Sequence, residues 1–207
     1  MKTINFARYS LMLVRNIIFQ GILYMSTGEK IYKLSITFIL SIIFYYIFNN
    51  LTISILSAHL LNYIINGQFY VVYRYFDPNA NMKEGDLLKY ISFIERNIII
   101  FKPLDVLIIG GVARGTVKST SDLDIRIYHN NKMLDSIKAY VMATVFRFYG
   151  LVTRFPIDVF CFSNLKFLEK IRKDEIPVNF MNHKDIERKY PLSINYKFQL
   201  DKIKYDS

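Results

Sequence analysis

Residues 34–73 contain no Lys, Arg, Asp or Glu, and this stretch constrains the fold more than any other feature of the chain. A helix needs about 20 apolar residues, each rising 1.5 Å, to cross a bilayer core of about 30 Å. The segments 31–50 and 51–73 each reach that length, and Asn49-Asn50 divides them. The sequence therefore predicts an N-terminal α-helical hydrophobic hairpin inserted in a membrane, with its turn at the two asparagines.

Basic residues flank the open end of this hairpin, at Lys30, Lys33 and Arg74, whereas its tip carries no charge. Positive charge collects on the cytoplasmic side of a membrane, so both ends are expected in the cytoplasm. A signal peptide is excluded because a long polar and basic lead precedes the apolar run. A single tilted or re-entrant segment and a soluble helical pair remain open. His59 is expected to form a hydrogen bond inside the bundle rather than bind a ligand.

Polar residues 76–85 mark a boundary between a helical region, residues 1–75, and a second region, residues 76–207. Apolar periodicity predicts helices over residues 84–100 and 132–149, the latter with Gly150 as an end cap. Apolar runs predict strands at residues 106–109, around the Asp122 segment, and at residues 157–162. This order predicts an α/β (α+β) fold with a small mixed sheet flanked by helices.

Two aspartates stand on the second of these strands. Asp122 and Asp124 alternate with apolar residues, so they share one face with Arg126 and lie about 7 Å apart along the strand. Two like charges this close cost free energy unless positive charge lies between them. Mg²⁺, which binds through carboxylates and substrate phosphates, would supply it. The alternative is a solvated Asp pair in a turn.

Asp158 is the one acidic residue in the third apolar strand. A buried carboxylate without a partner is costly, so Asp158 must face either a metal or a hydrogen-bond donor. Cys161, the single cysteine, lies in the same apolar strand and is expected to be an inert core thiol. One cysteine excludes an internal disulfide, and the sequence has no Cys/His cluster for structural zinc.

The order Gly110-Gly111, Ala113-Arg114-Gly115 and Ser121-Asp122-Leu123-Asp124 resembles the DNA polymerase beta-like nucleotidyltransferase superfamily, most closely its minimal branch. That branch more often has Ser at the position of Gly111. The resemblance covers about residues 104–162 and implies two Mg²⁺ ions bound to three catalytic carboxylates. It also implies contacts to a nucleoside triphosphate.

The implied catalytic and metal-binding residues are Asp122, Asp124 and Asp158, and the implied nucleotide-binding residues are Gly110, Gly111, Arg114 and Ser121. Arg126 joins the nucleotide-binding set by strand alternation alone, with a structural salt bridge to an Asp as its alternative.

The sequence therefore predicts a membrane-anchored, Mg²⁺-dependent nucleotidyltransferase whose catalytic domain faces the cytoplasm. It would transfer a nucleoside monophosphate to a hydroxyl on a lipid-linked, glycan or protein acceptor. The alternative is a non-catalytic or regulatory protein of this fold, such as a toxin–antitoxin component. The net charge of +10 suits an anionic leaflet or nucleic acid equally. No RNA-binding module is recognisable, and the apolar N-terminal region favours the lipid bilayer as partner.

Overall fold

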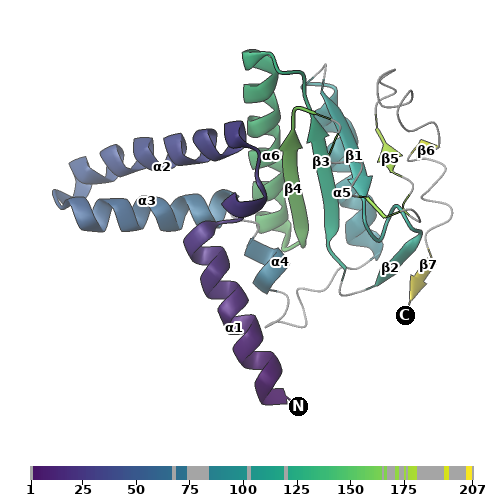
Figure 1. Cartoon of the computed structure of the whole chain (residues 1–207), viewed down its shortest axis with the longest axis horizontal. Coiled ribbons are helices and arrows are strands. Elements are labelled where there is room, and N and C mark those ends of the chain that lie inside the picture. The colour runs from purple at the N-terminus through teal and green to yellow at the C-terminus, as the bar shows by residue number, and fades with distance from the viewer. Residues whose placement is uncertain are drawn as a thin grey trace.

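The computed structural model describes residues 2–66, 69–73, 84–101, 104–118, 121–164, 166, 171, 172, 175, 177–180, 194, 195 and 204–206. A helical hairpin projects sideways from an α/β body, and a further helix runs crosswise at the base of the hairpin (Figure 1). This crosswise helix is α1 (Lys2–Phe19). A short 3₁₀ turn, η1 (Ile22–Tyr24), follows it and leads to the hairpin. The chain thus has the mixed helix and sheet content that the sequence predicts.

The hairpin consists of α2 (Thr27–Phe48) and α3 (Leu51–Asn66). Asn49 adopts a left-handed conformation, φ 48°, and its N–H donates to the Tyr45 carbonyl, which ends α2 at the predicted turn. Helix α2 is long and apolar enough to cross a membrane, and only 6% of its most apolar window is buried. Large apolar side chains along α2 are exposed, for example Phe38 at 67% and Tyr46 at 85%. A helix packed inside a soluble body would not leave these side chains uncovered.

The second arm of the hairpin is described as two helices, α3 and α4 (Phe69–Tyr73), and residues 67 and 68 between them lie outside the described residues. The 16 residues of α3 rise about 24 Å, compared with about 30 Å for a bilayer core. The Asn66 side chain accepts a hydrogen bond from Arg147 of the α/β body (2.7 Å), so this end of α3 lies against the body.

Buried polar residues fasten the base of the hairpin to the body. Glu29 of α2 forms an ion pair with Arg147, and both side chains are at most 2% exposed. Lys33 donates to the carbonyl oxygens of Gln20 and Asn66, each at 2.7 Å. Lys33, expected among the charges at the membrane interface, is therefore a buried structural residue. We call Glu29, Lys33, Asn66 and Arg147 the base cluster.

His59 has the structural role that the sequence predicts. Its ring Nε2 lies 2.9 Å from the carbonyl oxygen of Ile17, and its ring Nδ1 lies 3.2 Å from the side-chain nitrogen of Gln20. Gln20 also donates to the backbone carbonyl of His59 (2.8 Å). These contacts join the end of α1 to the middle of α3.

A five-stranded mixed sheet with the order β4-β3-β1-β5-β6 forms the body. Strand β1 (Asp105–Ile109) pairs antiparallel with both β3 (Leu123–Tyr128) and β5 (Val178–Asn179). Strand β4 (Ile157–Phe162) runs parallel to β3, and β6 (Ile194–Asn195) runs parallel to β5. A separate parallel pair joins β2 (Thr116–Lys118) to β7 (Lys204–Asp206).

Helices α5 (Glu84–Ile98) and α6 (Met133–Thr153) cover one face of this sheet (Figure 1). The apolar positions predicted for α5 are buried in the core, except Leu88, which is 44% exposed. Gly150 was expected to cap α6 but lies inside it, and Arg154, with φ 56°, is the cap instead. A Cβ at Gly150 would lie 2.5 Å from Ile157 Cγ2, so this glycine lets α6 pass close to β4.

Candidate active site

The face of the sheet opposite α5 and α6 carries the polar side chains of β3 and β4. Leu123, Ile125 and Ile127 of β3 are buried, and the residues that alternate with them are half-buried, as the sequence predicts. Parallel pairing sets Asp124 directly beside Asp158, so the two carboxylates come from adjacent strands at the same level. Asp122 precedes β3 by one residue and lines the same cavity as Asp158. The structure thus brings the three predicted acids together.

Arg126 lies between two of these carboxylates. Its Nη2 atom is 3.4 Å from Asp124 Oδ1 and 3.3 Å from Asp158 Oδ2. Its Nη1 atom donates to the carbonyl oxygens of Ile125 (2.9 Å) and Asp158 (3.1 Å). The guanidinium also lies 5.0 Å from the ring centroid of Phe160. The structural salt bridge, the alternative role for Arg126, is the arrangement observed.

The glycine bend after β1 lies against the same carboxylates. Gly110 has φ +74°, and a Cβ there would lie 2.2 Å from Asp124 Oδ2. A Cβ at Gly111 would lie 2.9 Å from the Thr116 carbonyl oxygen and 3.6 Å from the Ser121 hydroxyl oxygen. Gly110 is therefore required both for its backbone angle and because a side chain would meet Asp124, and Gly111 is required because a side chain would meet the Thr116 backbone.

Burial raises the pKa of the Asp124 carboxyl from 3.8 to about 7. The Arg126 guanidinium opposes this rise in pKa, whereas the charges of Asp122 and Asp158 add to it. Burial likewise raises the pKa of Asp158, again against the effect of Arg126. A raised pKa means that the protein favours the protonated, neutral form of both carboxyls, so a bound cation would stabilise their charged forms.

A cavity of about 590 Å³ opens over this face of the sheet. Asp122, Arg126 and Asp158 form the polar part of its floor. Phe160 and Phe162 of β4 form the apolar part. The opposite wall comes from α1 and η1, where Met12, Arg15, Asn16, Phe19, Leu23 and Tyr24 line it. The site therefore combines charged and apolar surfaces from segments far apart in the sequence.

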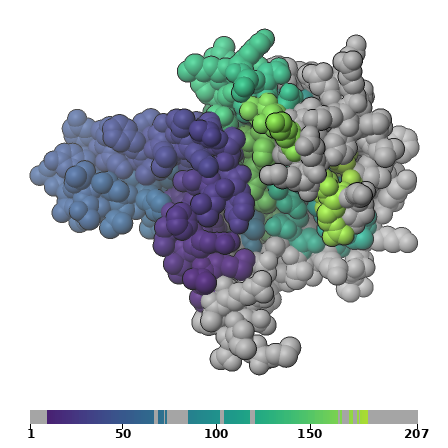
Figure 2. All heavy atoms as spheres, viewed as in Figure 1, coloured from purple at the N-terminus to yellow at the C-terminus, as the bar shows by residue number. Residues whose placement is uncertain are grey.

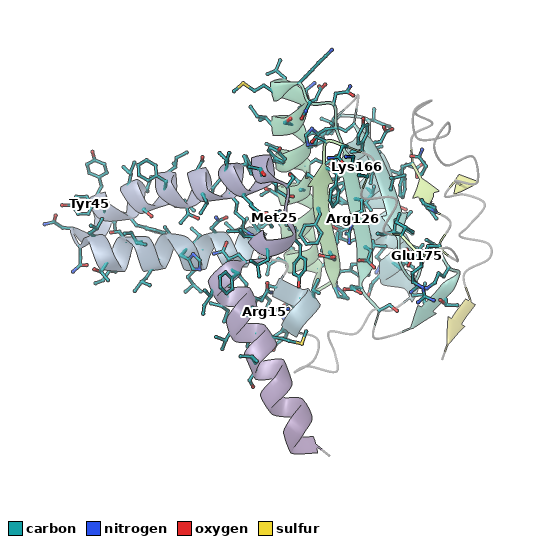
Figure 3. The ribbon with its side chains drawn as sticks, in the orientation of Figure 1. Arg15, Met25, Tyr45, Arg126, Lys166 and Glu175 are labelled. Atoms are coloured by element: carbon teal, nitrogen blue, oxygen red, sulfur yellow. The ribbon has the colours of Figure 1, made fainter. Side chains whose placement is uncertain are left out.

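Arg114, predicted to bind phosphate, forms an ion pair with Glu175 at the margin of this cavity. The Glu175 side chain is only 8% exposed, so this acid faces the protein rather than solvent. Figure 3 shows Arg126 on the sheet and Glu175 on its side farther from the hairpin. Glu175 and the α1 wall carry no local sequence signal that marks them as part of a site.

The metal site remains a prediction. Within the described residues, no group of three or more His, Cys, Asp or Glu side chains could hold a metal ion as it stands. The chemistry nevertheless suits a hard divalent cation, because the available donors are carboxylate oxygens. When ionised, Asp122, Asp124 and Asp158 would carry three negative charges, and Arg126 supplies one positive charge beside Asp124 and Asp158. Mg²⁺ would compete with Arg126 for Asp124 and Asp158.

Comparisons with known proteins identify no relative for this chain: no family model, curated protein or solved structure matches it.

Proposed function

We propose that the chain is a membrane-anchored, Mg²⁺-dependent nucleotidyltransferase that moves a nucleoside monophosphate from a nucleoside triphosphate to a hydroxyl acceptor. The convergence of Asp122, Asp124 and Asp158 beside the Gly110-Gly111 bend is the observation that carries this proposal. Phosphoryl transfer depends on positioning and charge neutralisation more than on covalent chemistry. Three clustered carboxyl groups, beside a bend free of side chains, suit a metal-bound triphosphate.

In the proposed reaction, the acceptor hydroxyl oxygen attacks the α-phosphorus and forms a new O–P bond. The bond from the α-phosphorus to the oxygen bridging to the β-phosphate breaks, and pyrophosphate leaves with that electron pair. The Asp158 carboxylate accepts the hydroxyl proton and passes it to solvent. Asp122, Asp124 and Asp158 would hold Mg²⁺, whose contribution when bound is to stabilise charge on the attacking and leaving oxygens.

The remaining residues would bind and orient the triphosphate. The absence of side chains at Gly110 and Gly111 allows close approach of a phosphate group. Arg126 would exchange its carboxylate partners for phosphate oxygens once the metal binds Asp124 and Asp158. Arg114 is held at the margin of the cavity by Glu175, and Ser121 lies beside the bend at Gly111.

The test is transfer of label from each of the four [α-³²P]NTPs with MgCl₂, using detergent-purified protein and isolated membranes. Asp122→Asn and Asp124→Asn should each abolish transfer. Asp86→Asn is the matched control, because Asp86 is a partly exposed helix residue paired with Lys89 (3.5 Å). Transfer that survives both site substitutions, or no Mg²⁺-dependent binding of any NTP, would contradict the proposal.

One observation favours a second candidate, a non-catalytic or regulatory protein of the same fold. Arg126 already lies between Asp124 and Asp158 and neutralises part of their charge without a metal. For such a protein, Mg²⁺ should neither bind at these acids nor raise thermal stability. Isothermal titration of wild type and Asp124→Asn with MgCl₂ separates the two candidates.

A further inference from the structure

Helix α1 separates the exterior of the molecule from the candidate site, and it presents a different surface to each. Leu11, Val14 and Ile18 follow one another at helical spacing and are 51–70% exposed. Met12, Asn16 and Phe19 of the same helix line the cavity over the acids. An amphipathic helix with an exposed apolar stripe is the type that lies in a membrane interface.

The position of α1 fits such an interface. The helix runs crosswise to the hairpin and meets it at its base, so a membrane entered by the hairpin would pass nearest to the end of α1 that meets the hairpin (Figure 1). The space-filling view shows α1, in purple, against the foot of the blue hairpin, with the body on the other side (Figure 2). Exposed Leu23 and Tyr24 of η1, at 56% and 61%, continue the apolar surface to the hairpin.

The base cluster holds this arrangement in place. Glu29 of the hairpin accepts a hydrogen bond from the Cys161 backbone N–H (3.1 Å), and Arg147 donates to the Val159 carbonyl. Both are backbone groups of β4, the strand that carries Asp158. The hairpin is therefore fixed to the strand that bears a proposed catalytic residue. A membrane that holds the hairpin would then lie at a fixed distance from the site.

We propose that the cavity between α1 and the acidic face of the sheet binds the polar headgroup of a membrane lipid, and that a hydroxyl on this headgroup is the acceptor. This inference rests on the proposed nucleotidyltransferase function. The lipid chain would stay with the apolar surfaces of α1, η1 and the hairpin. The headgroup would lie between the α1 wall and Asp158, where Arg15 of α1 adds positive charge to the lining. A volume of about 590 Å³ is sufficient for a headgroup-sized ligand.

Two tryptophan substitutions provide a matched pair of variants. Met12→Trp would fill part of the cavity, whereas Leu134→Trp adds the same ring at a position of α6 that is 73% exposed and does not line the cavity. Leu134 lies outside α1, η1 and the hairpin, so the control should not disturb the anchor. The full chain is reconstituted in liposomes made from lipid extracted from membranes of its source organism, and parallel liposomes contain phosphatidylcholine alone.

Each preparation is incubated with the four [α-³²P]NTPs and MgCl₂, then extracted with chloroform and methanol. We expect label in the organic phase with the native lipid extract and none with phosphatidylcholine. Met12→Trp should lower this transfer at least tenfold, and Leu134→Trp should change it less than twofold. Label found only in water-soluble or protein fractions, or equal transfer by the two tryptophan variants, would overturn the inference.

Mg²⁺-dependent NTP binding, measured by equilibrium dialysis on the same samples, distinguishes the two levels of proposal. Binding without lipid labelling overturns the lipid acceptor and leaves the nucleotidyltransferase proposal standing. Absence of binding for every NTP overturns both.

Discussion

Charge removal at Glu29 tests whether the base cluster holds the hairpin to the body. Glu29→Gln keeps a side-chain oxygen that can accept from the Cys161 N–H but leaves the Arg147 guanidinium without its carboxylate. The two side chains are 1% and 2% exposed, so solvent cannot replace the lost partner. Loss of one member of a buried ion pair costs roughly 3–5 kcal/mol. For a chain of this size that corresponds to a fall in Tm of about 6–20 °C.

The chain provides its own probe for this experiment. Cys161 is the only cysteine, it is fully buried, and its backbone N–H donates to Glu29. Burial raises the pKa of its thiol, so a thiol-reactive fluorogenic dye should label it only after the structure opens. Heating the detergent-solubilised protein with this dye therefore reports unfolding at the hairpin base.

A double-mutant cycle separates the ion pair from other effects. Glu29→Gln and Arg147→Met should each lower the Tm, and the double variant should lower it by clearly less than the sum. Asp86→Asn breaks an exposed pair with Lys89 and should shift the Tm by less than about 2 °C. Additive effects in the double variant, or single shifts as small as that of Asp86→Asn, would refute a coupled pair.

Three further predictions concern the site. Gly110→Ala should weaken Mg²⁺-dependent NTP binding in equilibrium dialysis at least tenfold, because its Cβ would meet Asp124; Gly85→Ala, which meets nothing within 4 Å, should not. The pKa of Asp124 is raised to about 7, so the metal-free protein should lose stability as pH rises from 5 to 8, and MgCl₂ should raise the Tm more at pH 8 than at pH 6. An equal Mg²⁺ effect at both pH values would contradict a site at this carboxyl. Arg126→Met should make the Tm more dependent on MgCl₂ than in wild type, because the carboxylates lose their internal cation.

The floor of the site was predictable because its residues obey local rules. Strand alternation places Asp124 and Arg126 on one face and the apolar residues of β3 on the other. A single acid in an apolar strand indicated Asp158, and the pairing of β3 with β4 sets it beside Asp124. The glycine bend was visible as a motif, and the structure adds its reason, since Asp124 fills the space a side chain would take.

The wall of the site and the base cluster could not be predicted, because their residues meet only through the tertiary fold. Arg15 and Asp158 line one cavity although most of the chain separates them. Glu29 and Lys33 look like exposed charges at the start of an apolar helix, yet both are 1% exposed. Their partners in α6 and α3 have no fixed spacing from them in the sequence.

The base cluster also changes how the hairpin length should be judged. A span length estimated from hydropathy starts at the first apolar residue of the helix. The first turns of α2, including Lys33, are however packed against the body. About 15 residues, 34–48, then project beyond the cluster and rise about 22 Å, which is less than a bilayer core of about 30 Å.

Because α2 and α3 are joined by a tight turn, both ends of the hairpin lie on the same side of the membrane whether or not its tip crosses. The cavity would therefore face the leaflet that the hairpin enters, and a cysteine placed at Asn50 should resist a membrane-impermeant maleimide added to either side if the tip stays within the core. Rapid labelling from the side opposite the body would instead show a hairpin that crosses completely.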